Sequence, residues 1–253
     1  MMPDMSINEI NRCMNESPEN FISLCEKQYD DRLNSICDRL IRDFDSHCFV
    51  MVAGPSSSGK TTTSSIIRNK LINSGRSAKV ISLDDFYRNQ DVKFTFEDGT
   101  VDYETIKALD VDYISECLQN LMKNGSCMLP RFNFITKTRE SYSETILDKD
   151  EIVIVEGLHA LNPTITDPLE GFGMRKLYVS VSSRITDGDK IHMSKRDIRL
   201  VRIAIGMDSD TEKDDDIFFY CDTLEDLKSL AENSSEDFYI ADCYGFGVYE
   251  DLL

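Results

Sequence analysis

The chain has 253 residues, of which 41% are hydrophobic and 29% are charged, a balance typical of a globular domain. Its formal net charge of −18 argues against sequence-independent nucleic-acid binding, which requires a surface rich in lysine and arginine. Because it has no apolar run of membrane-spanning length, no signal-peptide pattern and no zinc-ligand spacing among its eight cysteines, we expect a cytoplasmic protein with reduced thiols and with neither nucleic-acid nor membrane partners.

The first predicted element is a long amphipathic helix over residues 17–45. Ser17 suits the N-cap of this helix, and Pro18 suits its first helical position. Apolar residues then recur at helical spacing, at Ile22, Cys25, Tyr29, Leu33, Ile36, Leu40 and Phe44. We therefore expect residues 1–46 to form an N-terminal helical leader to a main domain over residues 47–253.

The main domain begins with a strand, a glycine-rich loop and a helix in direct succession. The apolar run 49–53 predicts a buried strand, and residues 61–73 predict a helix that ends at Gly75. Further strands are expected at 78–82, 151–156 and 176–181, and a helix is expected from Val111 to the Asn124–Gly125 pair. This alternation predicts an α/β fold with a parallel sheet that helices cover on both faces.

The composition changes abruptly after residue 205. A basic helical stretch at 195–205 gives way to an acidic run at 208–216. Blocks of like charge are normally solvated, so we expect this run to form a loop and not a metal site. Beyond it, the pattern predicts a short helix at 223–233, an edge strand at 237–242 and a terminal helix at 248–253.

Residues 54–61 match GxxxxGK[ST], the phosphate-binding loop (P-loop, or Walker A motif), between the first strand and helix. The glycines allow successive backbone N–H groups to converge on phosphate oxygens at the first turn of the helix. Lys60 is expected to reach the transferred phosphoryl group, and the Thr61 hydroxyl is expected to bind Mg²⁺. The expected ATP-binding residues are Gly54, Ser56, Ser57, Ser58, Gly59, Lys60, Thr61 and Thr62.

Three carboxylates follow strands of the predicted sheet. Asp84 and Asp85 come after one strand and Glu156 ends another, at the edge where open α/β sheets bind ligands. One aspartate could accept the proton of a substrate hydroxyl, and Glu156 lies where P-loop proteins place a carboxylate for Mg²⁺. Ordinary capping by these acids is the alternative. The Asn-Lys pair at 69–70 lacks the aspartate of a guanine-reading NKxD motif, which ranks a kinase ahead of a GTPase.

Taken together, these motifs resemble the uridine kinase and phosphoribulokinase group of P-loop kinases, and its bacterial uridine kinase-like branch most closely. The matching blocks are AGPSSSGKTT, ISLDDFYRN, DGTVDYETIKALD, LPRFNFITKTRE, IVIVEGLHALNP, KLYVSV and SKRDIRLVR. The resemblance implies a P-loop fold with a small substrate-binding insertion at residues 86–145. It also implies phosphoryl transfer from ATP, with Mg²⁺, to the 5'-hydroxyl of a nucleoside, with uridine or cytidine as the expected substrate.

The resemblance further implies roles for individual residues. Asp84 takes the role of general base toward the 5'-hydroxyl, and Asp102 would bind the other hydroxyls of the sugar. Phe132 and Asn133 correspond to the stretch that contacts the base, and Arg139 corresponds to the basic end of the substrate-binding hairpin.

The sequence departs from the family pattern at the lid. Arg199 and Arg202 correspond to the first catalytic arginines of the lid helix, but residues 203–207 lack the arginines that follow, and a divergent acidic segment covers 206–236. An arginine at a phosphoryl-transfer transition state is worth about a thousandfold in rate or more. A regulatory protein that binds ATP without turnover is therefore one alternative, and a kinase of another small hydroxylated metabolite, such as a sugar phosphate or pantothenate, is a second. The residues leave open the nucleoside, the donor (ATP or GTP), the activity and the state of homo-oligomerisation.

Overall fold

The structure, a computed structural model, describes residues 5–43, 48–55, 58–89, 94–95, 102, 105–181, 184–194 and 246–250. The predictions for Ser56, Ser57, Arg199 and Arg202, for the acidic run at 208–216, and for the elements at 223–233 and 237–242 lie outside these residues. Contacts divide the chain into two compact units. The first comprises Met1–Ser35, Pro55–Lys60 and Tyr178–Tyr249, and the second comprises Ile36–Gly54, Thr61–Leu177 and Glu250–Leu253. The domain boundary expected between residues 46 and 47 stays a prediction.

A five-stranded sheet has the strand order β10-β7-β2-β6-β3. The strands are β2 (Cys48–Ala53), β3 (Ala78–Ser82), β6 (Ile152–Glu156), β7 (Gly173–Val181) and β10 (Phe246–Glu250). β2 and β3 both pair in parallel with β6, so that Val52 and Ser82 are the partners of Glu156 on its two sides. The carboxyl ends of these three strands therefore lie at one edge of the sheet.

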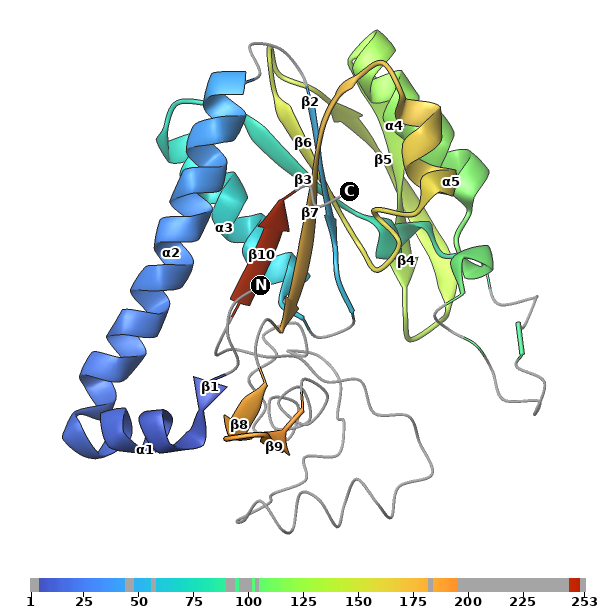
Figure 1. Cartoon of the computed structure of the whole chain (residues 1–253). Helices are drawn as coiled ribbons and strands as arrows, with labels where there is room; N and C mark the ends of the chain where they lie inside the picture. Colours follow the sequence, from blue (N-terminus) through green and yellow to red (C-terminus); the bar gives the residue numbers. More distant parts are fainter. Residues whose placement is uncertain are drawn as a thin grey trace. The chain divides into compact units, whose positions relative to one another are not determined.

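Helices cover the sheet on both faces. Figure 1 shows α3 (Lys60–Asn73) on one side, with α4 (Val111–Asn124) and the short α5 (Pro163–Thr166) on the other. On the α4 side, alternate residues of the strands and the inner face of the helix form a buried apolar cluster that includes Phe49, Met51, Val153, Val155, Ile114, Leu118 and Leu121. Gly125 ends α4 in the left-handed conformation, at φ 76°, and its N–H donates to the Leu121 carbonyl.

The long N-terminal helix α2 spans Pro18–Asp43. Leu33, Ile36 and Leu40 on its apolar face are buried. The Cys37 thiol donates to the Ile67 carbonyl of α3, and Asp43 forms an ion pair of 2.7 Å with Arg175 of β7. The C-terminal turns of α2 are thereby attached to both α3 and β7.

A two-stranded antiparallel hairpin is formed by β4 (Ser126–Asn133) and β5 (Thr138–Ile146). The register pairs Phe132 with Arg139, and it shifts between Arg131 and Phe132. Short 3-10 helices are η1 (Leu83–Phe86), η2 (Ile106–Ala108) and η3 (Asp167–Leu169). β4 contacts η1, the segment that carries both predicted aspartates.

Four small elements belong to the first unit. These are β1 (Met5–Ser6), α1 (Ile7–Glu16), β8 (Ile185–Asp187) and β9 (Lys190–Met193). β8 pairs in parallel with β1 and antiparallel with β9. The three strands could not be predicted from the sequence, because strands of two to four residues carry too little periodicity to be recognised.

The structure confirms the predicted α/β class, the long helix, the strand–loop–helix succession and the later strands of the sheet. The predicted helix at 248–253 is wrong, because residues 246–250 form β10. Phe246, Val248 and Tyr249 are aromatic or β-branched, and such residues favour strands. In the described part of the chain, no helix has both the length and the apolar character that a membrane span needs.

Candidate functional site

The P-loop runs from Gly54, directly after β2, to Lys60, the first residue of α3. Gly59 adopts the left-handed conformation, with φ 84°, which glycine reaches without steric cost. The Ser58 N–H and the Lys60 Nζ both donate to the Pro55 carbonyl at 3.1 Å. These contacts link Pro55 to Ser58 and to Lys60 at the N-terminus of a 14-residue helix, where backbone N–H groups and the helix dipole favour an anion.

Ser58 provides the test of whether this loop fits a polyphosphate. Its side chain is 1% exposed, and its Oγ has no hydrogen-bond partner among the described residues. A buried polar atom without a partner costs about 1–3 kcal/mol. A phosphate oxygen bound in the loop would supply the missing acceptor, so the donor set fits a phosphate group.

Glu156 occupies the centre of the strand edge. It ends β6, is 3% exposed, and lies in register with Val52 of the P-loop strand and Ser82 of β3. The next residue, Gly157, donates its N–H to the Val52 carbonyl at 3.1 Å. The carboxylate of Glu156 and the hydroxyl of Thr61 are oxygen ligands of the kind that Mg²⁺ prefers.

The two aspartates after β3 differ in their surroundings. Leu83 and Phe86, at the ends of η1, are buried, which leaves Asp84 exposed between them. The Asp84 N–H donates to Ser82 Oγ at 3.3 Å, whereas Asp85 Oδ1 accepts from the Phe132 N–H of β4 at 3.2 Å. Asp85 is thus engaged with the hairpin, while Asp84 lies on the exposed side of η1, beside the strand edge.

Gly157 and Leu83 touch at close range. A Cβ placed on Gly157 would lie 2.7 Å from Leu83 Cβ and 3.1 Å from Leu83 Cγ and Cδ1. Carbon atoms in contact are normally about 3.5–4.0 Å apart. Only glycine at this position lets the chain after β6 pass so near the residue that precedes Asp84.

Aromatic rings gather beside the two aspartates. The ring of Phe132 lies 5.6 Å from that of Tyr87 and 5.1 Å from that of Phe134, and the rings of Tyr87 and Phe134 are 6.0 Å apart. Phe132 is 6% exposed, but Phe134 is 57% exposed. The cluster therefore presents an aromatic surface to solvent within the same unit as Asp84.

Two more of the predicted substrate residues, Asn133 and Asp102, form contacts within the protein. Asn133 Oδ1 accepts from the N–H groups of Ile135 and Thr136, and its Nδ2 donates to Glu140 Oε1 at 2.6 Å, so this side chain shapes the hairpin turn. The Asp102 N–H donates to the Phe94 carbonyl at 2.8 Å.

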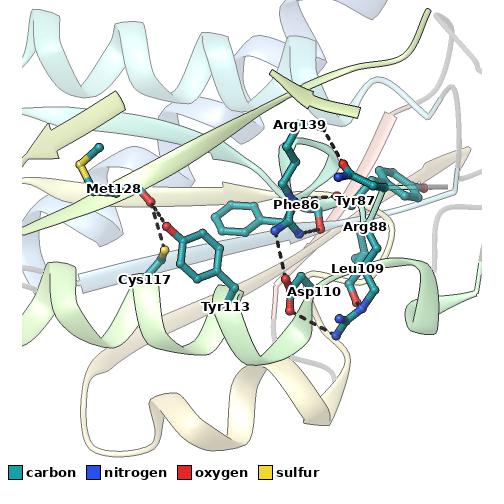
Figure 2. A network of polar contacts seen from close by, with 10 residues as sticks. Phe86, Tyr87, Arg88, Leu109, Asp110, Tyr113, Cys117, Met128 and Arg139 are labelled. Carbon is teal, nitrogen blue, oxygen red and sulfur yellow. Dashed lines mark hydrogen bonds and ion pairs between the residues drawn. The ribbon is translucent and has the colours of Figure 1, made fainter. Parts of the chain in front are cut away.

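Arg139 is surrounded by protein groups. Figure 2 shows its guanidinium between the backbone of Phe86 and Tyr87 and the carboxylate of Asp110. Asp110 also forms an ion pair of 3.2 Å with Arg88. Arg88 and Asp110 lie in the blocks ISLDDFYRN and DGTVDYETIKALD. They could not be recognised from the sequence, because spacing does not show which basic and acidic residues meet.

Tyr113 connects α4 to the hairpin. Its hydroxyl donates to the Met128 carbonyl of β4 at 2.8 Å, and the Cys117 thiol donates to the same carbonyl at 3.4 Å. Burial raises the pKa of the Tyr113 phenol above its ordinary value. These bonds attach the hairpin at a point remote in sequence from its turn.

Comparison with known proteins now identifies the family. A profile of the phosphoribulokinase / uridine kinase family matches residues 49–198, more than half of the chain. The chain belongs to this family of kinases. The matched segment contains the P-loop, Asp84, Glu156 and the whole hairpin.

Individual relatives agree with the family assignment. The chain is 31% identical over 134 residues to a uridine kinase of Staphylococcus haemolyticus, covering 52% of this chain and 61% of that protein. It is 32% identical over 125 residues to a uridine kinase of Aliivibrio salmonicida, covering 48% and 56%. The chain thus spans about six-tenths of the length of these relatives.

A solved structure shows the same fold. The structure of a possible uridine kinase from Bacillus stearothermophilus superposes with a TM-score of 0.50 at 21% identity, covering 60% of this chain and 80% of that one. This similarity confirms the expected P-loop kinase fold.

Of the predicted site residues, the strand register brings together the ends of β2, β6 and β3, and hence Gly54, Glu156 and the start of η1. Pro55–Lys60 belongs to the first unit, and Gly54, Thr61, Thr62, Asp84 and Glu156 belong to the second. The hairpin residues Phe132 and Arg139 contact η1 and the residue after it. The roles of all these residues in catalysis are proposals.

Proposed function

We propose that the protein transfers the γ-phosphoryl group of ATP to the 5'-hydroxyl of a pyrimidine nucleoside, uridine or cytidine. The observation that carries this proposal is the shared strand edge: the P-loop, Glu156 and the Asp84 segment follow three adjacent parallel strands in register. The carboxyl ends of adjacent parallel strands are where open α/β sheets bind ligands. Family membership and the names of the relatives support the same reaction class.

The phosphate end of the site is assigned to the P-loop. Backbone N–H groups at the start of α3 and the Ser58 hydroxyl would bind phosphate oxygens, and Lys60 would leave the Pro55 carbonyl to reach the transferred group. Thr61 and Glu156 would hold Mg²⁺, which supplies positive charge to the phosphates. Arg199 and Arg202, which lie outside the described residues, are proposed to add positive charge from the lid.

Asp84 is proposed to orient the nucleoside 5'-hydroxyl and to accept its proton. Asp84 is exposed on η1, as a group that meets a substrate must be. Such a base typically contributes about 10²–10⁴-fold to the rate. Asp102 is proposed to bind the remaining sugar hydroxyls.

The aromatic cluster of Tyr87, Phe132 and Phe134 is proposed to stack against the base. A planar base finds there an exposed ring, Phe134, supported by two rings at 5–6 Å. Stacking of a base on an aromatic side chain is worth about 1–3 kcal/mol. This surface favours a nucleoside over a sugar phosphate, which has no planar aromatic ring to stack.

The test is ADP formation from ATP and Mg²⁺ with a panel of nucleosides and sugar phosphates. We expect turnover that depends on a pyrimidine nucleoside and that Asp84→Asn lowers by about 100-fold or more. Asp112→Asn, which removes an exposed carboxylate of α4, is the matched control and should keep the wild-type rate. Nucleoside-independent hydrolysis, or a rate that Asp84→Asn leaves unchanged, would contradict the proposal, whereas tight ATP binding without any turnover would favour the regulatory alternative.

A further inference from the structure

Each of the three guanidinium nitrogens of Arg139 contacts another group of the protein. Its Nε donates to the Tyr87 carbonyl at 2.9 Å, its Nη2 donates to the Phe86 carbonyl at 2.9 Å, and its Nη1 binds Asp110 Oδ2 at 3.0 Å. The side chain is only 12% exposed. These contacts favour a role inside the protein over direct contact with the substrate.

Two of these contacts complete the end of η1. The 3-10 helix carries Asp84 and ends at Phe86, and the last carbonyls of a helix lack partners within the helix. Arg139 binds the carbonyl of that last residue and the one after it with a single planar group. Arg139 therefore holds η1, which carries Asp84, at its C-terminal end.

The third contact, with Asp110, links Arg139 to the start of α4. Asp110 precedes α4, its N–H donates to the Phe86 carbonyl at 2.9 Å, and its carboxylate binds Arg139 and Arg88 through separate oxygens. Arg88 in turn donates from Nε to the Leu109 carbonyl at 3.1 Å. Five polar contacts thus join η1, the residues before α4 and the hairpin. They involve the carboxylate of Asp110 and the carbonyls of Phe86 and Tyr87.

The hairpin end of the network is a single cross-strand pair. Arg139 of β5 lies opposite Phe132 of β4, and the Phe132 N–H binds Asp85. This pair of residues therefore contacts η1 at Asp85 and at Phe86. The ring of Phe132 also belongs to the aromatic cluster. These contacts hold the hairpin against η1 and so relate the position of the proposed base-stacking surface to that of Asp84.

We propose that Arg139 is a positioning residue that holds Asp84 and the aromatic cluster in register for phosphoryl transfer to a nucleoside. This inference rests on the proposed function, and Asp110 and Arg88 act through Arg139. Lysine cannot replace Arg139 fully, because one ammonium does not reproduce the planar fork that reaches two carbonyls and a carboxylate together.

The experiment compares Arg139→Met and Arg139→Lys with Arg131→Met, a control that removes an exposed arginine of the same hairpin. Steady-state kinetics should show kcat lowered about 10- to 100-fold by Arg139→Met, because a misplacement near 1 Å can cost about 100-fold. The nucleoside KM and the Kd of ATP should change far less, Arg139→Lys should lie in between, and Arg131→Met should match the wild type. A raised KM at unchanged kcat would make Arg139 a direct substrate ligand and overturn the proposal, as would wild-type kinetics.

A second measurement separates this inference from the proposed function. Hydrogen–deuterium exchange of peptides that cover residues 83–89 does not depend on turnover. We expect faster exchange of these peptides in Arg139→Met and no change in Arg131→Met. If Arg139→Met does not fold, Arg139→Lys takes its place in the comparison. Unchanged exchange would overturn the positioning role even in an active kinase, while faster exchange in a protein without nucleoside-dependent turnover would refute only the proposed function.

Discussion

Replacing Gly157 with alanine tests how the strand edge is built. The new Cβ would lie 2.7 Å from Leu83 Cβ, so the two segments must separate by about 1 Å to reach an ordinary carbon–carbon contact. Leu83 Cβ is attached directly to the backbone and cannot rotate away, so η1 itself must move. Overpacking of this kind costs about 1–3 kcal/mol, which corresponds to a fall in Tm of roughly 2–12 °C for a chain of this size.

The same displacement should reach the proposed catalytic carboxylate. Asp84 follows Leu83 directly, and a shift near 1 Å in a catalytic group can lower the rate by about 100-fold. We therefore expect Gly157→Ala to lower kcat for nucleoside-dependent ADP formation more than it raises the KM of either substrate. Differential scanning calorimetry and steady-state kinetics on the same preparation measure both effects.

Gly75→Ala is the matched control. Gly75 follows α3 at φ 82°, and a Cβ placed on it would have no other atom within 4 Å. Alanine in this left-handed conformation costs roughly 1–2 kcal/mol, so the control lowers stability by a similar amount without moving η1. An unchanged Tm and kcat in Gly157→Ala, or an equal loss of kcat in Gly75→Ala, would refute the reasoning.

Three further predictions concern other parts of the chain. Lys60→Ala should lower ATP affinity in calorimetric titration, and unaltered affinity would contradict the assigned P-loop. Phe134→Ala should raise the nucleoside KM about 5- to 100-fold, as expected for the loss of one stacking contact, and an unchanged KM would contradict the base-stacking surface. Burial raises the pKa of the Cys37 thiol to about 11 and that of Cys48 to about 12. Their stabilisation is complete below pH 9, the ordinary thiol value, and is lost above it, because unfolded thiols then ionise while folded ones stay protonated. Urea unfolding at alkaline pH should therefore show a shallower loss of stability in Cys48→Ala than in the wild type, and equal slopes would contradict the burial effect.

The fold could be predicted where the sequence pattern repeats over many residues. Apolar residues at helical spacing identified α2, and unbroken apolar runs identified β2 and β6, whose residues are buried on both faces. The P-loop was recognisable because its glycines, lysine and threonine occur at fixed spacing between a strand and a helix. In each case the signal is local, so neighbouring residues suffice to reveal it.

The remaining features depend on contacts between distant segments. Arg139 meets Asp110 and Tyr87 across 29 and 52 residues of sequence, and nothing in either local pattern indicates the pairing. The contact of Asp85 with the Phe132 N–H, 47 residues further along the chain, is likewise absent from the local pattern. β10 was mistaken for a helix because five residues are too few to separate the two periodicities.

The identity of the phosphorylated product tests the central claim most directly. The protein would be incubated with ATP, Mg²⁺ and uridine or cytidine, and the product would be identified by mass spectrometry and phosphorus NMR. The account predicts a nucleoside monophosphate with the phosphate on the 5' oxygen, formed by the wild type and at least about 100-fold more slowly by Asp84→Asn. A phosphate on another oxygen, or formation of the 5'-monophosphate at the same rate by both proteins, would contradict it.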